Sequence, residues 1–496
     1  MTNYTKKALW NSAYMIIFGM LASFCAYLLR ILLASSLQSY EYGLVYAIFA
    51  FVGLFSLFQH FGLGQALIKY ISTFLVKKEY SKIKEVILLV VIYQLIFSIL
   101  LGLVFLVLSS FLGKYYFGYP EISTFLFRVY LISIVLSPFD IVIASIFQGY
   151  QRIDLFSYAN LIKFAFILFS TWVMLRLGFG VIAVVYAYAL YPLLMLIAFL
   201  PAFFHLFPYF LKEKYTLTVA TSKMLFGFGI PVLLATAAGI VMSYTDTFVL
   251  TIFRSLEEVG MYNAALPTVQ ILWFLPALIT TIFFPLSSEL HERKESKLLA
   301  KGITVLYKYA VAIILPAAII MVAFPSIILN LLFGEQYISG ATSLQILAVA
   351  SIFYTIVSIN ASVFAGMGKP EVNTKITIIA SILNLVGNFL LIPKFGMFGA
   401  AVSTAVAFFV MMILSLQILR KSVNVAIPLI LWSKLFIAAM FSLGAIALIK
   451  LILITNPWIE LLLSAAAAGI VYLSILYAMK IFTYNELAEY IGRLRK

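Results

Sequence analysis

Long apolar segments separated by short polar turns run through this sequence, and they limit its fold more than any other feature. A helix needs about 20 mostly apolar residues to cross a membrane. Such segments recur along the 496 residues, of which 64% are hydrophobic and only 10% are charged. A soluble domain carries about 25% charged residues. The chain therefore needs lipid as its solvent, and we predict an all-α integral membrane protein.

The apolar segments predict about fourteen transmembrane helices. The first two are separated at the short polar break from Gln38 to Glu41. The apolar run from Ala8 to Leu33 is longer than the roughly 7–15 residues of a signal peptide, so we interpret it as an uncleaved first helix. The predicted ranges are Trp10–Leu37, Gly43–Phe61, Val86–Leu112, Ile122–Phe147, Leu155–Leu177, Val181–Leu211, Met224–Phe253, Met261–Leu286, Ile303–Phe333, Ala341–Phe364, Val372–Ile392, Gly396–Leu419, Ile427–Ile454 and Trp458–Phe482.

The distribution of positive charge predicts the orientation of these helices. Cytoplasmic loops carry an excess of lysine and arginine. With the N-terminus in the cytoplasm, only seven of the 33 lysine and arginine residues lie on or near the outer side: Arg30, Lys114, Arg128, Arg176, Arg254, Lys394 and Lys450. We therefore predict a multi-pass protein of the cytoplasmic membrane with both termini cytoplasmic. The net charge of +15 indicates anionic inner-leaflet lipid rather than nucleic acid as its counter-charge.

The sequence also contains an internal repeat at an offset of 217 residues. Ala144–Gly149 falls on Ala361–Gly366, and Glu41–Gly43 falls on Glu258–Gly260. Because the offset spans six predicted helices, both copies have the same orientation, which is typical of a parallel repeat. We therefore predict three parts: residues 1–214 with helices 1–6, residues 215–421 with helices 7–12, and residues 422–496 with helices 13–14 and a cytoplasmic tail.

Several motifs resemble a known superfamily. They lie mainly in the second half of the chain, and they are Phe61–Gly64, Glu257–Ala265, Leu332–Tyr337, Gly366–Pro370, Asn384, Asn388 and Leu391–Ala401. The chain resembles the multidrug/oligosaccharidyl-lipid/polysaccharide flippase superfamily, in its lipid-linked oligosaccharide branch. The lipid II branch carries several arginines in its early helices, whereas Arg30 is the comparable residue in this sequence.

The resemblance implies a V-shaped transporter with two six-helix lobes that works by alternating access. The implied function is to move a polyprenyl- or dolichyl-linked oligosaccharide across the cytoplasmic membrane for polysaccharide or surface glycan biosynthesis. The expected partners are the bilayer and this lipid-linked sugar, without nucleic acid. We expect no cofactor, and a proton or sodium gradient could drive transport. The oligomeric state is left open, a monomer included.

Two other classes of function are considered. The first is an ion-coupled multidrug antiporter of the same fold. The second is a membrane-embedded glycan polymerase or glycosyltransferase, against which the short outer loops and the lack of a catalytic motif count, so we predict no enzymatic activity. Gly62-Leu63-Gly64 and Gly227-Phe228-Gly229 lack the strand–turn–helix context of a nucleotide site, and we interpret them as packing or hinge glycines. The three histidines lie on separate segments, so we predict no metal site.

Charges within the membrane are the candidate site residues. An ionisable group at the bilayer centre costs about 2.5–3.5 kcal/mol and usually faces a cavity or a partner. Asp140 and Lys163 lie at similar distances from the turn between the fourth and fifth helices, so we predict an intramembrane ion pair, which is either structural or responsive to cations.

Arg30 and Asp246 occupy nearly equivalent positions in the two repeats. The resemblance implies that their helices line the cleft between the lobes. Arginine pairs with phosphate through its planar fork, so we predict that Arg30 contacts the head group and pairs with Asp246 when the outer gate closes. The alternative interpretation of Arg30 is an arginine that reaches the outer membrane interface.

The predicted topology can be tested by cysteine accessibility. With Cys25 replaced by serine, external thiol reagents should label cysteines placed at Tyr119 and Gln336. Cysteines at Lys78 and Lys297 should be labelled only after the membrane is made permeable. External labelling at either lysine position would contradict the predicted orientation.

Overall fold

The computed structural model describes residues 3–208, 210–451 and 456–481, and this part of the chain is helical without a β-strand. Eleven of its helices are long and apolar enough to cross a membrane, or up to 12 if one bent pair counts as a span. The predicted all-α membrane fold is therefore confirmed. The end of the predicted last helix and the cytoplasmic tail lie outside the described residues.

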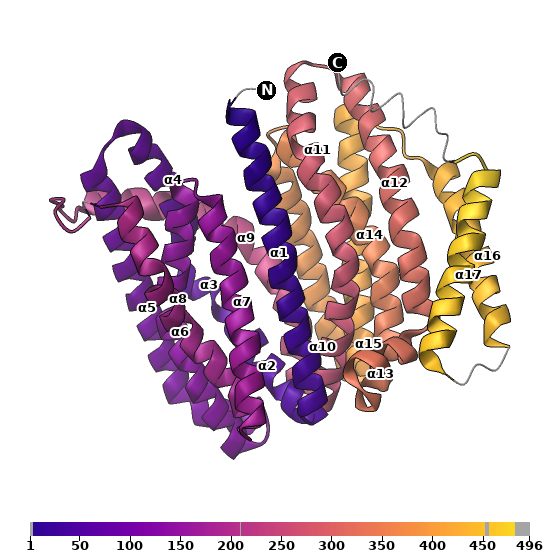
Figure 1. The fold of residues 1–496 in the computed structure, drawn as a ribbon, viewed down its shortest axis with the longest axis horizontal. Coiled ribbons are helices and arrows are strands. Elements are labelled where there is room, and N and C mark those ends of the chain that lie inside the picture. The colour runs from indigo at the N-terminus through magenta and orange to yellow at the C-terminus, as the bar shows by residue number, and fades with distance from the viewer. Residues whose placement is uncertain (1–2, 209, 452–455, 482–496) are drawn as a thin grey trace. The chain divides into compact units, whose positions relative to one another are not determined.

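The chain forms two compact units, Met1–Gly260 and Met261–Lys496. The helices of the first unit are drawn from indigo to magenta in Figure 1. They are α1 (Asn3–Ser36), α2 (Ser39–Phe55), α3 (Leu57–His60), α4 (Leu63–Lys77), α5 (Tyr80–Tyr115), α6 (Pro120–Gly149), α7 (Ile153–Arg176), α8 (Ile182–Leu206), α9 (Val219–Phe253) and the start of α10 (Leu256–Gln270).

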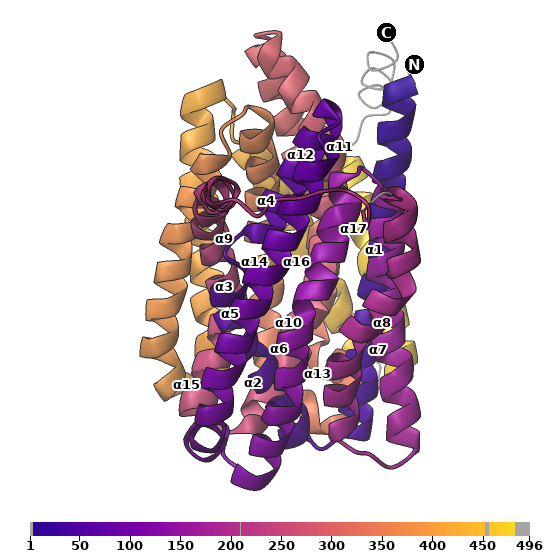
Figure 2. The ribbon, with the colours of Figure 1, turned by 90° about the vertical axis from the view of Figure 1, so that its left-hand side faces the viewer.

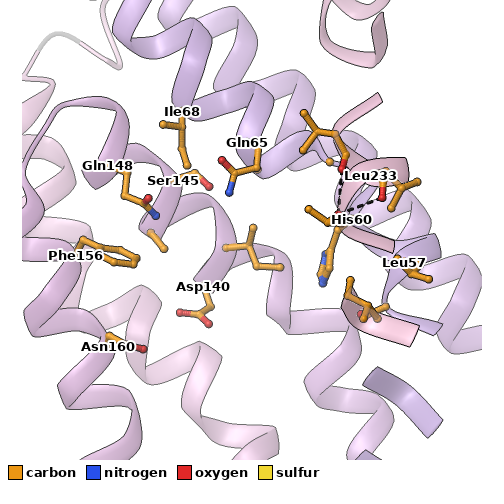
Figure 3. Close-up of a pocket in the computed structure, with 18 of the residues that line it drawn as sticks. Leu57, His60, Gln65, Ile68, Asp140, Ser145, Gln148, Phe156, Asn160 and Leu233 are labelled. Atoms are coloured by element: carbon orange, nitrogen blue, oxygen red, sulfur yellow. Dashed lines mark hydrogen bonds between the residues drawn. The ribbon is translucent and has the colours of Figure 1, made fainter. Parts of the chain in front are cut away.

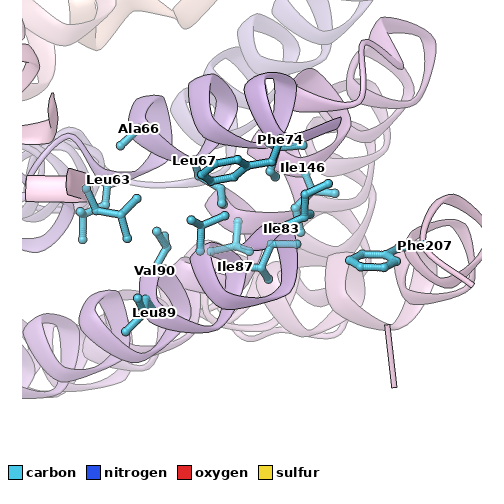
Figure 4. Close-up of a cluster of buried hydrophobic side chains, with 14 of the residues drawn as sticks. Leu63, Ala66, Leu67, Phe74, Ile83, Ile87, Leu89, Val90, Ile146 and Phe207 are labelled. Atoms are coloured by element: carbon cyan, nitrogen blue, oxygen red, sulfur yellow. The ribbon is translucent and has the colours of Figure 1, made fainter. Parts of the chain in front are cut away.

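Within the first unit, α5, α6 and α8 pack in sequence, and α7 packs between α8 and α1 (Figure 2). A cluster of buried apolar side chains joins α4 to α5 and α6 (Figure 4). Its members include Leu67 and Phe74 from α4, Ile83 and Val90 from α5, and Ile146 from α6. This cluster fixes α4, which carries several cavity residues, to the rest of the unit.

The predicted second helix, Gly43–Phe61, is too short. After a break the chain continues as α4 to Lys77, and the bent pair α2 and α3–α4 deviates by 44°. α4 carries apolar residues on its core-facing side and polar residues such as Gln65, Lys69 and Ser72 elsewhere. This amphipathic composition lowers its mean hydropathy, so a search for apolar runs interprets it as a loop.

Pro138 interrupts the hydrogen bonding of α6, and Gln59 of α3 compensates for the loss. Proline lacks an N–H, so the carbonyl of Ile134 four residues earlier has no helical donor. The Nε2 of Gln59 donates to this carbonyl at 2.7 Å and to the Oγ of Ser98 at 2.8 Å. Gln59 is only 3% exposed, so this buried amide connects α3 to α5 and α6.

The second unit contains the remaining helices in the described residues. They are η1 (Ile271–Trp273), α11 (Phe274–Glu292), α12 (Ser296–Ala323), α13 (Pro325–Phe333), η2 (Glu335–Gly340), α14 (Ala341–Gly366), α15 (Pro370–Val423), α16 (Leu429–Lys450) and α17 (Pro457–Ala478). Within this unit α14 packs against α11, α12 and α15, and α16 packs against α12 and α17.

α15 is assigned as one continuous helix by its hydrogen bonding, but a kink divides it into two helical halves. Its 54 residues would extend about 80 Å as a straight helix, well beyond the roughly 30 Å of a hydrocarbon core. Gly396 has a positive φ of 57°, and the Oγ of Ser403 donates to the carbonyl of Asn384 at 2.9 Å. The chain therefore folds back near Gly396, between the predicted helices Val372–Ile392 and Gly396–Leu419.

Fourteen helices are thus an approximate count. The difference from eleven has three sources in the described residues: the folded-back α15, the bent pair, and the predicted helix Met261–Leu286. The last of these is divided among α10, η1 and α11, none of which is long and apolar enough alone.

The predicted repeat is visible in the helix boundaries. At the same offset of 217 residues, the start of α2 at Ser39 corresponds to the start of α10 at Leu256, and the end of α6 at Gly149 to the end of α14 at Gly366. Gly43 and Gly260 are also related by this offset, and they lie close together. A Cβ on Gly260 would be 2.6 Å from the carbonyl oxygen of Ser39. The two glycines therefore let the backbones of α2 and the start of α10 approach closely.

α9 belongs to the compact first unit, although it begins the second repeat. Glu85 of α5 accepts hydrogen bonds from the backbone N–H and hydroxyl of Thr218 at 2.8 and 2.7 Å, immediately before α9. Further along, the Tyr70 hydroxyl donates to the carbonyl of Met224. The compact units consequently divide the chain at a different place from the predicted parts 1–214, 215–421 and 422–496, which follow the repeat and stay a prediction.

We predict that Gln59→Leu destabilises the protein by about 1–3 kcal/mol, because it removes a buried donor from the Ile134 carbonyl. Pro138→Ala restores a backbone N–H for this carbonyl and should reduce the cost of Gln59→Leu. Thermal unfolding in detergent measures both effects. The exposed Gln65→Leu serves as a control with a change within about 0.5 kcal/mol. If Gln59→Leu lowers the stability equally with Pro138 and with Pro138→Ala, Gln59 does not compensate for the missing N–H of Pro138.

Candidate functional site

The break between α3 and α4 is built from two residues in the left-handed region. Phe61 has φ 43° and Gly62 has φ 68°. A Cβ on Gly62 would overlap the carbonyl oxygen of Gly229 in α9, and a Cβ on Gly229 would be 2.6 Å from the carbonyl oxygen of Phe61. Both glycines therefore allow two backbones to touch, which agrees with their interpretation as packing glycines.

A cavity of about 440 Å³ lies beside this break within the first unit. Its polar lining comes from five helical segments or their ends, and Figure 3 shows Gln65, Asp140 and Gln148 on one side of the space and His60 on the other. The polar residues that line it are Ser56, His60, Gln65, Asp140, Ser145, Gln148, Asn160, Lys163 and Thr236. Amide, hydroxyl and charged groups thus converge in the interior of an otherwise apolar unit.

Asp140 and Lys163 lie together in the lining of this cavity. The Nζ of Lys163 is 2.8 Å from the Oδ2 of Asp140, and the side chains of Lys163 and Asp140 are 24% and 13% exposed respectively. The same Nζ lies 4.7 Å from the ring centre of Tyr191. The two opposite charges compensate each other inside the unit. Their role in transport stays a prediction.

His60 closes the cavity from the side of the helix break. Its Nδ1 atom is buried and makes no hydrogen bond to the described residues. No signal in the sequence placed His60 in the same cavity as the Asp140–Lys163 pair. Among the described residues, no three His, Cys, Asp or Glu side chains come together as metal ligands would.

Arg30 lies on α1 against a group of aromatic rings in the first unit. Its guanidinium carbon is 4.4 Å from the ring centre of Tyr46. Tyr46 contacts Tyr42 at 4.7 Å and Phe49 at 5.8 Å between ring centres. Arg30 therefore points into the protein toward α2, which differs from an arginine that extends to the membrane interface.

The rings continue from Arg30 to the ion pair. Phe49 contacts Tyr188 of α8 at 4.6 Å, Tyr188 contacts Tyr191 at 6.1 Å, and Tyr191 lies under the Lys163 ammonium. We call Tyr46, Phe49, Tyr188 and Tyr191 the aromatic column. The sequence could not indicate it, because aromatic residues are frequent throughout the chain and only their packing selects these four.

Asp246 is buried in α9 at 3% exposure, between the buried residues Thr245 and Thr247. Two residues further along, the carbonyl of Phe248 accepts a hydrogen bond from the Tyr116 hydroxyl. The carboxylate is thus enclosed by protein. The predicted gate between Arg30 and Asp246 stays a prediction.

A second buried polar group lies in the second unit and includes Asn384 and Asn388, which stand out in the sequence only as motif residues. The Nδ2 of Asn384 donates to the Oγ1 of Thr404 at 3.0 Å, and the Nδ2 of Asn388 donates to the Oδ1 of Asn384 at 3.2 Å. All three residues are buried. The amides join the two halves of α15, and a signal for them existed, since two asparagines one turn apart are unusual in an apolar helix.

The fold and these intramembrane polar groups define a multi-pass membrane transporter, and comparisons with known proteins agree. The lipid II flippase MurJ, in an inward closed conformation, matches the fold with a TM-score of 0.74 at 15% identity, over 97% of this chain and 100% of that chain. An uncharacterized membrane protein of Methanocaldococcus jannaschii is 30% identical over 506 residues, covering 100% of both chains. A Haloferax volcanii protein named as a probable low-salt glycan biosynthesis flippase is 23% identical over 254 residues, which is 51% of this chain and 54% of that protein.

Residues 8–291 match the family model described as polysaccharide biosynthesis protein. The chain therefore belongs to this family, within the multidrug/oligosaccharidyl-lipid/polysaccharide flippase superfamily, and it is a flippase-type transporter. The resemblance predicted from its motifs is confirmed.

We predict that Asp140→Asn and Lys163→Met each destabilise the protein by about 3–5 kcal/mol, because each leaves one charge buried without its partner. The double variant should cost less than the sum of the two single variants. Thermal unfolding in detergent at one pH gives the three values. Strict additivity would show that the 2.8 Å contact contributes no coupling energy.

Proposed function

We propose that this protein moves a lipid-linked oligosaccharide from the inner to the outer leaflet of the cytoplasmic membrane by alternating access. The substrate would be a polyprenyl or dolichyl carrier joined to a glycan through phosphate or diphosphate. Membership in a polysaccharide biosynthesis family supports this class of substrate, as does the glycan flippase name of the Haloferax volcanii relative.

The observation that carries the proposal is the position of Arg30. Its guanidinium is held over Tyr46 in the interior of a membrane unit. An arginine stays charged in any membrane environment, and its planar fork can bind two phosphate oxygens at once. A guanidinium held against an aromatic ring suits an anionic ligand, because the ring orients its plane for contact with two oxygens at once. The phosphate of the carrier is such a ligand.

The surrounding rings suit the sugar part of the same substrate. Phe49 and Tyr188 of the aromatic column are only partly buried, as is Tyr244, whose ring packs against Gly53. Aromatic faces pack against the C–H faces of sugar rings while hydroxyl groups at their edges exchange hydrogen bonds. We propose that these residues contact the first sugars beyond the phosphate.

The Asp140–Lys163 pair is our candidate for coupling to an ion gradient. It lines a cavity that also contains His60, so a proton or a sodium ion entering there would meet a carboxylate, an ammonium and an imidazole. A cation that binds Asp140 competes with Lys163 and changes the charge of the cavity. Transport that depends on an imposed proton or sodium gradient, and loses this dependence in Asp140→Asn, would support the assignment.

We predict that Arg30→Ala lowers the apparent affinity for a lipid-linked glycan about 10–100-fold, because one charged hydrogen-bonding group is lost. Arg30→Lys should restore part of the affinity, since it keeps the charge but loses the fork. Proteoliposomes are loaded with lipid extract from a strain that lacks the gene. The measured quantity is the share of lipid-linked glycan that an enzyme added outside can cleave.

The control is Arg176→Ala, which removes an exposed arginine at the end of α7. Equal transport by Arg30→Ala, Arg176→Ala and the natural protein would contradict the role of Arg30. Resistance to cationic drugs on expression, without any effect on lipid-linked glycan, would replace the flippase hypothesis by the multidrug antiporter.

A further inference from the structure

Gln94 of α5 is a buried amide that makes no hydrogen bond to the described part of the chain. The side chain is 0% exposed, and both its Nε2 and its Oε1 are without a partner there. Within a membrane no bulk water satisfies such a group. An amide that is fully buried and unpaired therefore calls for a physical reason, and neither the ion pair nor the Arg30 site uses it.

Gln94 and Ser98 lie one helical turn apart on the same face of α5. Ser98 accepts a hydrogen bond from Gln59 of α3 at 2.8 Å. A shift of α3 by one turn, about 6 Å along α5, would bring the amide of Gln59 from Ser98 to Gln94. Two facing amides can exchange N–H···O bonds, so the move would satisfy the group that is unpaired in this structure.

The other contacts of Gln59 allow it to leave. The carbonyl of Ile134, freed by Pro138, accepts hydrogen bonds both from Gln59 and from the Oγ of Ser137, the latter at 3.0 Å. The hydroxyl of Ser137 also accepts a hydrogen bond from the Nε2 of Gln59 at 2.6 Å. When Gln59 departs, the carbonyl therefore keeps one of its two donors. The hydroxyl of Ser137 lies on the same helix as the carbonyl, so it moves with α6.

The backbone on both sides of α3 is suited to such a shift. α3 has only four residues, Leu57–His60, and is flanked by the bend at Ser56 and by the left-handed pair Phe61 and Gly62. Short elements between breaks can move by one turn past a packed neighbour without unfolding the helices beyond them. α4 is held separately by its apolar contacts to α5.

We propose that α3 is a two-position element, with Gln59 bound to Ser98 in this conformation and to Gln94 in a second conformation of the transport cycle. His60 is adjacent to Gln59, so the same shift moves His60 relative to Asp140 and reshapes the cavity beside the break. The inference concerns the conformational cycle of the chain and does not depend on which substrate is moved.

The test removes Gln94, the partner of Gln59 in the second conformation, and at the same time stabilises the conformation in which Gln59 binds Ser98. Gln94→Leu replaces the unpaired amide by an apolar group of similar size, which should raise the Tm in detergent, because a buried unsatisfied group is lost. Spin labels at the exposed residues Glu121 and Glu335, one in each unit and in a Cys25→Ser background, report the conformational equilibrium by pulsed distance measurements. We expect more than one distance population in the natural sequence and a single one in Gln94→Leu.

The matched control is Thr171→Val. Thr171 is also fully buried, and its hydroxyl has no hydrogen-bond partner among the described residues, but it lies on α7 away from this contact. Its replacement should raise the Tm without narrowing the distance distribution. A Gln94→Leu distribution that superimposes on that of the natural sequence would overturn the proposal. A lower Tm in Gln94→Leu would also overturn it, since it would show that Gln94 has a partner in the present conformation.

Discussion

A backbone polar group that is freed within the membrane is costly unless it finds a partner inside the protein, and this cost governs the second span of the chain. Breaking the span at Phe61 and Gly62 frees backbone groups in the middle of the unit, and Pro138 frees the Ile134 carbonyl nearby. Gln59 donates a hydrogen bond to the Ile134 carbonyl, and the backbones of Gly62 and Gly229 lie in close contact beside the break. The break is thus stabilised by contacts from α5, α6 and α9, and a cavity with polar lining can exist beside it.

Much of the fold follows from the sequence because hydropathy and repetition are strong signals in a membrane protein. The sequence places the turn at Gly396 correctly, since a proline and a glycine interrupt an apolar run there. It does not reveal α4, because an amphipathic helix in a membrane unit has the composition of a loop. The apolar residues of α4, such as Leu67 and Ile71, become recognisable as a core face only when α5 is packed against them.

The sequence predicts single residues of the candidate site but not how they assemble. Intramembrane charge is costly enough to single out Arg30, Asp140, Lys163 and Asp246. The spacing of Asp140 and Lys163 from one turn is sufficient to place them together, because neighbouring antiparallel helices are related by local geometry. The aromatic column that connects Arg30 to Lys163 cannot be predicted from the sequence, since it depends on how rings from α2 and α8 pack. Long-range packing of common residue types cannot be predicted from a single sequence.

The two copies of the repeat also show why the cavity belongs to one of them. The end of α2 at Phe55 and the short η1 at Ile271–Trp273 lie at equivalent positions, so both copies interrupt their second helix at the same point. The positions equivalent to Phe61 and Gly62 are Leu278 and Ile279, and there α11 continues without a break. An isoleucine could not readily adopt the left-handed conformation that Gly62 provides. The first copy therefore has a further break at Phe61 and Gly62 that the second copy lacks, and this break bounds the short α3 and lies beside the polar cavity.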